Sequence, residues 1–156
     1  MKGLTTENLE IAGKKILLRL DLNVPLKNNN ITDVNRIEKI IPTIKFLIKK
    51  KSKIIILSHI GRPKGKTTNA LTLEPVAKKL SEILGLKVLL IKDEIDEKLI
   101  SKINSINSNS IIMLENIRFN EGEEKNDDKF AKKLSKLGEI YVNDAFSCSH
   151  REHASI

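Results

Sequence analysis

Short apolar runs alternate with longer amphipathic segments along the whole chain. Five runs are short, apolar and bounded by glycine or polar residues, which predicts buried strands at 15–22, Lys53–Leu57, 87–91, Ile111–Leu114 and 139–142. Four segments between them repeat apolar residues every three to four positions, which predicts helices at 34–51, 73–84, 96–106 and 127–137. We expect Thr32 or Asp33 to cap the first helix and Pro42 to kink it.

This alternation predicts one α/β domain: a three-layer, Rossmann-like parallel sheet with helices on both faces. Ligands of such sheets bind beyond the carboxyl ends of the strands. Four of the five predicted strands run into segments that combine polar and cationic residues, so we expect a site at that edge. The strand at 87–91 instead runs into Lys92, Asp93 and Glu94, and we expect its end to lie away from the site.

Composition narrows the class of protein. The chain has 156 residues, of which 40% are hydrophobic and 31% charged, which excludes a disordered chain and suits one domain with a core. The apolar runs are too short to span a bilayer, the first residues lack a secretory signal, and Cys148 is the single cysteine. We therefore expect a cytoplasmic protein with no membrane partner.

The net charge of +8 is less informative than the identity of the basic residues. Of the 28 basic residues, 23 are lysines and five are arginines, and the arginines lie at specific positions of the predicted fold. Four lie at or just past the ends of predicted strands, namely Arg19, Arg62, Arg118 and Arg151, and Arg36 lies in the first turns of the first helix. All three histidines, His59, His150 and His153, fall in two of the same loops. Because arginine binds phosphate and carboxylate through two parallel hydrogen bonds, this pattern predicts a site for a small anion.

The acidic residues at the same strand ends need other roles. Asp21 either accepts a hydrogen bond from a substrate hydroxyl or pairs with one of the arginines. Glu115 and Asp144 are expected to be structural, since a carboxylate at a strand end often caps a following segment. Cys148 lies two residues from His150, but this spacing does not set the geometry of a nucleophile and its base, and we expect a packed small residue.

Two other functions were weighed against the anion site. The segment Gly61–Thr67 resembles the loop of a P-loop NTPase, but it has three residues between its glycines instead of four, and four residues separate it from the next predicted helix. A basic nucleic-acid-binding domain would explain the charge. The lysines, however, are scattered over helix faces, and only 3% of the residues are aromatic, so we expect no nucleic-acid partner.

Taken together, the segments at the strand ends resemble the phosphoglycerate kinase family. The resemblance rests on four segments in order, RLDLNVP at 19–25, SHIGRP at 58–63, LENIRF at 114–119, and NDAF with HREHAS between 143 and 155. It implies reversible phosphoryl transfer between ATP and 3-phosphoglycerate, which yields ADP and 1,3-bisphosphoglycerate in glycolysis. One departure is SCS at 147–149, where relatives often have a glycine and small residues; we expect it to alter loop packing only.

The resemblance also implies roles for individual residues. Asp21 and Asn23 would hold the glycerate, and Arg36 would be the catalytic residue nearest the transferring phosphoryl group. The phosphate would be held by His59, Arg62, Arg118 and Arg151, with Leu22, Ile60 and Gly61 among the substrate contacts. Arg19, His150 and His153 would complete the basic patch in a secondary role.

The family's enzyme is a monomer with two α/β domains, the first for phosphoglycerate and the second for the nucleotide. Residues 1–156 match the first domain, so the resemblance implies that the nucleotide-binding domain is missing from this chain. The ligands of ATP or ADP and of Mg²⁺ would lie on that second domain, and no metal ligand is expected among these residues.

Overall fold

The computed structural model describes residues 10–107 and 110–156 and contains a five-stranded parallel sheet. The strands lie in the order β5-β6-β4-β1-β7. Their bounds are Lys15–Leu20 for β1, Lys53–Leu57 for β4, Val88–Ile91 for β5, Ile111–Leu114 for β6 and Ile140–Asp144 for β7. All four pairings are parallel, with β1 hydrogen-bonded to both β4 and β7. The predicted parallel sheet is therefore confirmed, and β5 lies at the edge farthest from β7.

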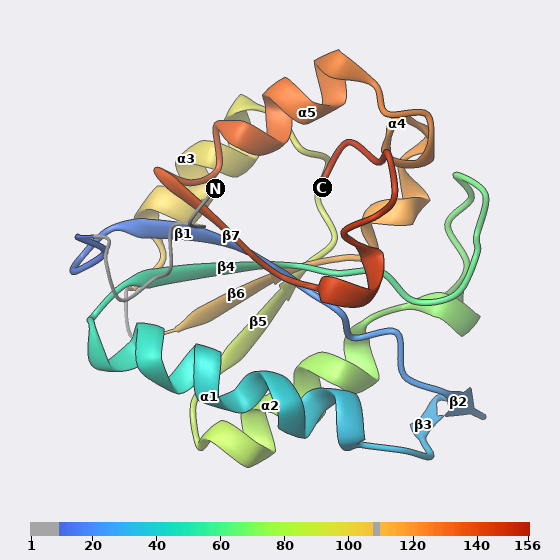
Figure 1. Ribbon diagram of the computed structural model, residues 1–156, viewed down its shortest axis with the longest axis horizontal. Coiled ribbons are helices and arrows are strands. Elements are labelled where there is room, and N and C mark those ends of the chain that lie inside the picture. The colour runs from blue at the N-terminus through green and yellow to red at the C-terminus, as the bar shows by residue number, and fades with distance from the viewer. Residues whose placement is uncertain (1–9, 108–109) are drawn as a thin grey trace.

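Helices cover both faces of the sheet, which confirms the predicted three layers (Figure 1). α1 (Asn35–Lys49) and α2 (Glu74–Leu84) lie on one face, and α3 (Glu97–Ser105) and α5 (Asp128–Ser135) lie on the other. The short α4 (Glu121–Glu124) and the 3-10 turns Asn69–Leu71, Ile117–Phe119 and Phe146–Cys148 lie in the connections. In the described residues, no helix combines the length and apolar character needed to cross a membrane.

Alternation along each strand divides the core into two clusters. Ile16, Leu18 and Leu20 of β1 are buried in the cluster under α1 and α2, whereas Leu17 belongs to the cluster under α3 and α5. β4 and β6 alternate in the same way, because successive side chains of a strand point to opposite faces. Arg19 consequently points toward the face that α3 and α5 cover.

The element boundaries differ from the predictions by a few residues. β1 ends at Leu20 instead of residue 22, because the Leu22 amide leaves the ladder and donates to Ser58 Oγ (3.1 Å). α1 begins at Asn35 and continues through Pro42. Its N-cap residue is Val34 and has no side-chain cap, so the expected cap by Thr32 or Asp33 is wrong; Asp33 Oδ1 instead accepts the Asn35 amide (2.8 Å) in the turn before the helix.

A small hairpin in the loop after β1 was not predicted. Its strands are β2 (Leu26–Lys27) and β3 (Asn30–Ile31), which pair antiparallel. Asn28 and Asn29 between them both have positive φ, a conformation that asparagine tolerates better than most residues.

Candidate functional site

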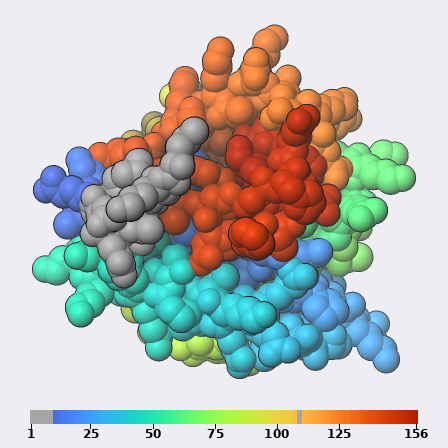
Figure 2. Space-filling model, in the orientation of Figure 1, coloured from blue at the N-terminus to red at the C-terminus, as the bar shows by residue number. Residues whose placement is uncertain are grey.

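The segments that carry the arginines and histidines converge at the carboxyl ends of β1, β4, β6 and β7. Figure 2 shows part of this region: residues 146–156 (red) lie between the orange α4–α5 region, the green segment that follows β4 and the blue-to-cyan segment that leads into α1. The sheet order explains the convergence, because β1 lies between β4 and β7, and β6 adjoins β4.

Arg19 is part of the interior behind this edge. Its side chain is 1% exposed, and all three guanidinium nitrogens have protein partners. Nε donates to Ser155 Oγ (3.1 Å), Nη1 to the Leu20 carbonyl (2.5 Å), and Nη2 lies 3.0 Å from His59 Nδ1. Burial lowers the pKa of Arg19, and the nearby Glu123 carboxylate opposes that shift. Arg19 thus supports the site from within and has no nitrogen left over for an external anion.

His59 is held in one protonation state by Arg19. A guanidinium can only donate, so His59 Nδ1 is the acceptor and the ring proton lies on Nε2. Burial, followed by the positive charges of Arg19 and Arg118, lowers the pKa of His59 to about 3. Within the described residues, Nε2 has no hydrogen-bond partner. The neutral ring therefore offers one free N–H donor.

Asp21 connects the first helix to the last loop. Its carboxylate accepts from Arg36 Nη1 and from Ser147 Oγ, and the Asn23 amide donates to it at 3.3 Å. Burial alone would raise the pKa of Asp21, but the hydrogen bonds from Ser147 and Asn23 and the charge of Arg36 together lower it. Of the two roles expected for Asp21, pairing with an arginine is the one present here.

The backbone after β4 is fixed by three side chains from other elements. Asn23 Oδ1 accepts the Gly61 amide (2.9 Å), Asn116 Nδ2 donates to the Ile60 carbonyl (2.8 Å), and Arg118 Nη1 donates to the Gly61 carbonyl (2.8 Å). Gly61 has φ +63° and a Cβ there would lie 2.6 Å from Leu71, so this position requires glycine. Leu22 and Ile60 are buried, with their amide and carbonyl respectively bonded inside the protein.

Arg118 and Arg151 carry buried nitrogens that have no hydrogen-bond partner in the described part of the chain. These are Arg118 Nε and Nη2 and Arg151 Nε. The Glu124 carboxylate lies 3.6 Å from Arg118 Nε, too far for a good hydrogen bond. Burial lowers the pKa of Arg118 and the charge of Arg151 adds to the shift, so the two cations lie near one another. Unsatisfied donors on buried cations are costly, and an anion would satisfy them.

The remaining predicted residues differ in their exposure to solvent. Arg62 is exposed and has no hydrogen bond or ion pair with any described residue. His150 is also exposed. His153 is mostly buried, with Nδ1 3.8 Å from Glu123 Oε1, and burial lowers its pKa.

Sequence reasoning missed a group of residues behind the arginines. Glu123 is fully buried and accepts from Ser155 Oγ (2.6 Å), and Tyr141 donates to the Ser155 carbonyl (2.6 Å). Burial raises the pKa of Tyr141 to about 12. Glu123 lies in the run EGEEK, which is typical of a solvated helix, so only the arginine at an inward position of β1 indicated that a buried carboxylate was needed.

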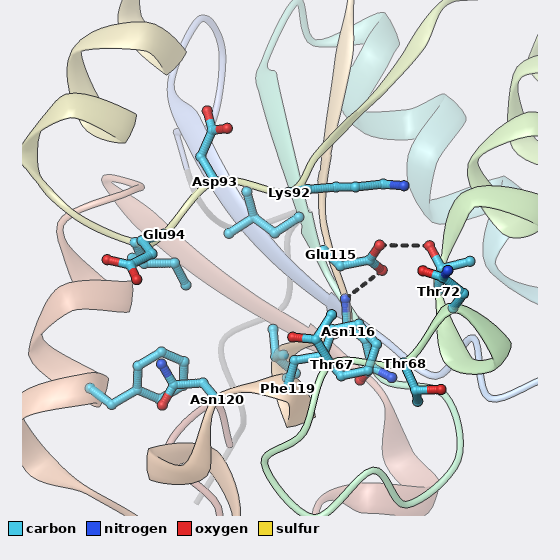
Figure 3. Close-up of a pocket in the computed structure, with 15 residues that line it drawn as sticks. Thr67, Thr68, Thr72, Lys92, Asp93, Glu94, Glu115, Asn116, Phe119 and Asn120 are labelled. Carbon is cyan, nitrogen blue, oxygen red and sulfur yellow. Dashed lines mark hydrogen bonds between the residues drawn. The ribbon is translucent and has the colours of Figure 1, made fainter.

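A cavity of about 310 Å³ lies at the ends of β5 and β6, and neither arginine nor histidine lines it. Figure 3 shows its polar lining, in which Glu115 points toward Thr72 and the Asn116 amide. Glu115 accepts from Thr72 Oγ1 (2.6 Å), from the Leu73 amide (2.7 Å) and from the Asn116 amide (2.9 Å). Glu115 is therefore structural, as expected, but it binds Thr72 and the Leu73 amide at the N-terminal boundary of α2, which precedes β6 in the chain. Asp144 is structural as well and accepts from Thr43 of α1 (2.6 Å).

The segment Gly61–Thr67 does not form a P-loop. Lys66 and Thr67 lie in irregular backbone, and a short 3-10 turn at Asn69–Leu71 precedes α2, which begins only at Glu74. The segment therefore does not lead directly into a helix N-terminus, as phosphate binding by such a loop requires. Cys148, the other residue weighed for chemistry, is buried, as expected for a packed residue.

Comparison with known proteins agrees with the geometry. A family model described as phosphoglycerate kinase matches residues 6–156. Phosphoglycerate kinases from Wolbachia sp. subsp. Drosophila simulans and Dictyoglomus turgidum are 50% and 51% identical over 150 and 146 residues, or 96% and 94% of this chain. The chain spans 37% of the length of each.

Solved structures show the same correspondence. The phosphoglycerate kinase from Coxiella burnetii superimposes with a TM-score of 0.85 at 40% identity, covering 97% of this chain and 37% of the other. With the sequence match spanning nearly all residues and the fold reproduced, the chain belongs to the phosphoglycerate kinase family.

Proposed function

We propose that this chain supplies the 3-phosphoglycerate site of a phosphoglycerate kinase, which transfers a phosphoryl group reversibly between ATP and the carboxylate of 3-phosphoglycerate. One observation carries the proposal: among the described residues, buried nitrogens of Arg118, which is buried, and of Arg151, which is half-buried, have no hydrogen-bond partners. The N–H of His59 and the guanidinium of Arg62, which also have no partner among the described residues, belong to the same edge of the sheet. This is the arrangement that a phosphate with three acceptor oxygens would complete.

The rest of the substrate fits the neighbouring groups. Asp21 is a 13% exposed carboxylate, and it would accept a hydrogen bond from the substrate hydroxyl in place of one of its present donors. Asn23 lies beside it and holds the Gly61 amide. Arg36, 47% exposed in the first turn of α1, would then be free to meet the carboxylate end and the transferring phosphoryl group.

In the proposed reaction, the protein takes little part in the covalent chemistry. A carboxylate is ionised at neutral pH, so no base is needed to activate it. What limits the reaction is bringing two anions together and stabilising the charge on the phosphoryl group, which positioned cations accomplish. We assign the substrate's phosphate to His59, Arg62, Arg118 and Arg151, and the transition state to Arg36.

ATP or ADP and Mg²⁺ are the family's co-substrate and metal, and their fit to these residues can be tested on the structure. Among the described residues, no group of three or more His, Cys, Asp or Glu side chains could hold a metal ion. The one loop with a phosphate-binding pattern lacks the helix it needs. Their ligands are therefore proposed on the part of the enzyme that this chain does not span.

Within the same proposal the complete enzyme is a cytoplasmic monomer whose partners are 3-phosphoglycerate and 1,3-bisphosphoglycerate, with no nucleic acid or membrane bound. The lysines support this, since they are spread over the helices instead of forming one stripe. Light scattering would test the monomer. Binding to DNA that weakens steeply with salt would contradict the absence of nucleic acid.

Calorimetry with the 156-residue chain tests the substrate assignment. We expect 3-phosphoglycerate to bind and ATP to give no heat, and Arg62→Ala to weaken binding about tenfold, the loss of about 1.4 kcal/mol. Lys66→Ala is the matched control in the same loop and leaves the affinity unchanged. Binding of ATP that is abolished by Lys66→Ala, without any response to 3-phosphoglycerate, would restore the P-loop interpretation.

A chimera that joins this chain to the remaining 63% of the Wolbachia relative tests the transfer step, since the chain covers 37% of that protein. Arg36→Lys should lower kcat about 100-fold with little change in KM, the typical loss for one transition-state donor. Arg62→Lys should mainly raise the KM for 3-phosphoglycerate. An unchanged kcat in the Arg36 variant would refute this division of roles.

A further inference from the structure

Glu123 is a buried carboxylate that the proposed reaction does not use. Its side chain is 0% exposed although it lies in the acidic four-residue α4, whose other glutamates reach solvent. Burial raises the pKa of Glu123, and the hydrogen bonds from Ser155 and the charge of Arg19 oppose that shift. A carboxylate is retained in such a place at a cost in desolvation, so its contacts indicate what it contributes.

Glu123 binds the segment at the end of the chain through three atoms. Its carbonyl accepts the Ala154 amide (3.0 Å), Oε2 accepts the Ser155 amide (3.1 Å), and Oε1 accepts the Ser155 hydroxyl (2.6 Å). The first two contacts fix the backbone of residues 154–155. The third uses the single proton of the Ser155 hydroxyl and thereby leaves Oγ as an acceptor.

Ser155 Oγ then receives Arg19 Nε at 3.1 Å. Because the hydroxyl proton is already directed at Glu123, the chain of hydrogen bonds has one direction only, from guanidinium to hydroxyl to carboxylate. The negative charge of Glu123 also balances the positive charge of Arg19, with the Ser155 hydroxyl between them. Both ends of this relay are buried, which strengthens the interaction.

At its other end Arg19 fixes His59. Nη2 donates to Nδ1 at 3.0 Å, so the ring keeps its proton on Nε2 and cannot rotate without losing that bond. If Arg19 moved, Nδ1 would lose its donor, and the two neutral forms of the ring would mix. In one of these forms His59 Nε2 carries a lone pair and no proton, and it could not donate a hydrogen bond to an anion.

We propose that Glu123 is a positioning residue for His59, acting through Ser155 and Arg19 to keep the Nε2–H form that donates to the substrate's phosphate. The proposal rests on the proposed function for the identity of that anion. It does not rest on it for the state of the ring, which can be observed without ligand.

Nitrogen NMR of histidine-labelled chain reads the ring directly. In the unmodified 156-residue chain, His59 should show Nε2 protonated and Nδ1 unprotonated. Glu123→Gln removes the charge and places an amide N–H opposite one of the donors of Ser155. We expect Arg19 to move, the His59 signals to become those of a mixture of both forms, and the affinity for 3-phosphoglycerate to fall about tenfold, the lower end for residues that support a histidine ligand.

Two further variants make the result decisive. Ser155→Ala cuts only the side-chain link and keeps the bond from Glu123 to the Ser155 amide, so it should reproduce the change at His59 even if Glu123→Gln fails to fold. Glu121→Gln makes the same chemical change on the exposed side of α4 and should alter neither readout. Within residues 10–107 and 110–156, Glu121 pairs with Lys125 alone, at the surface.

The outcomes separate the two proposals. If both relay variants keep a single Nε2–H form and the original affinity while thermal stability falls, Glu123 is structural and this inference is wrong. If the unmodified chain does not bind 3-phosphoglycerate, the proposed function fails, and the ring signals alone still decide whether Glu123 positions His59.

Discussion

The two faces of the sheet are built by the same strands but differ at their carboxyl ends. Leu18 and Leu20 of β1 point to the α1–α2 face and lie entirely among aliphatic side chains. Arg19, between them, points to the other face, where it meets Ser155 and the Glu123 carboxylate. The first face is thus covered mainly by apolar packing at this point, whereas the second contains buried charged groups that must be compensated.

We expect stability and substrate binding to be largely separate on the α1–α2 face and coupled on the face that holds Arg19 and Glu123. Aliphatic contacts under α1 and α2 are non-directional, and this cluster reaches the anion site only through Leu22 and Ile60. The relay on the opposite face holds both the last segment of the chain and His59. Variants on the first face should therefore affect folding alone, and variants on the second should affect folding and binding together.

Arg19→Met would break this comparison most severely. It leaves the buried Glu123 without its counter-charge and His59 without its donor, so we expect a loss of about 3–5 kcal/mol in the free energy of unfolding, together with weaker 3-phosphoglycerate binding. Urea unfolding and calorimetry measure the two effects. Adding Glu123→Leu should restore part of the stability but not the binding. A single variant as stable as the original chain would show that the relay stabilises nothing.

Ile44→Ala tests the aliphatic face. Ile44 of α1 has no exposed surface, and removing its side chain should cost about 2–5 kcal/mol through lost burial and a cavity. At temperatures where the variant stays folded, its affinity for 3-phosphoglycerate should equal that of the original chain. A weakened affinity in the folded variant would mean that the two faces are not independent.

The pH dependence of stability should sharpen the contrast further. His59 has a pKa of about 3 in the folded chain against an ordinary 6.5, so between these values the unfolded chain binds a proton that the folded chain does not. Stability therefore falls as the pH falls below 6.5, by about 1.4 kcal/mol per unit, or about 2 kcal/mol at pH 5.

His59→Gln removes this contribution and supplies the comparison. Urea unfolding of both chains at pH 7 and pH 5 should show that the free energy of unfolding falls about 2 kcal/mol more in the original chain than in the variant. The reason is that the variant lacks the imidazole at position 59. Equal losses in the two chains would mean that His59 is not held neutral.

Glu115→Gln should have the smallest effect. It weakens the cap of α2 beside the 310 Å³ cavity, and we expect a loss of about 1 kcal/mol, typical of a helix cap, with unchanged binding. Thermal unfolding and calorimetry measure both. A clear loss of affinity would contradict the separation of this cavity from the anion site.

The sequence was sufficient for the layers and the edge of the sheet because both depend on periodicity. Apolar runs such as Lys53–Leu57 were buried strands, and residues after the strands met at one edge. The hairpin at Leu26–Ile31 escaped because its strands have two residues each, too few to show a period. What fixed it was the left-handed backbone of Asn28 and Asn29, which sequence alone indicates only weakly.

The sequence predicted which types of residue form the site, but not which of them are buried. Arg19 lies near the end of β1 and Arg62 follows β4, yet Arg19 is buried with every nitrogen bonded and Arg62 is exposed without partners among the described residues. Glu123 escaped because an acidic run in a short helix looks solvated, and its burial depends on Ser155 from a distant segment. Such pairings are properties of the folded chain, not of any local pattern.

The position of β1 between β4 and β7 also has a consequence for synthesis. β7 follows β1 by about 120 residues, and Arg19 and Ser155 are 136 residues apart in the chain. A ribosome adding about 5–20 residues per second needs roughly 6–24 seconds to reach β7 after finishing β1. During that interval one edge of β1 stays unpaired and Arg19 lacks its serine, so the nascent chain exposes the strand that later supports the site for longer than any other.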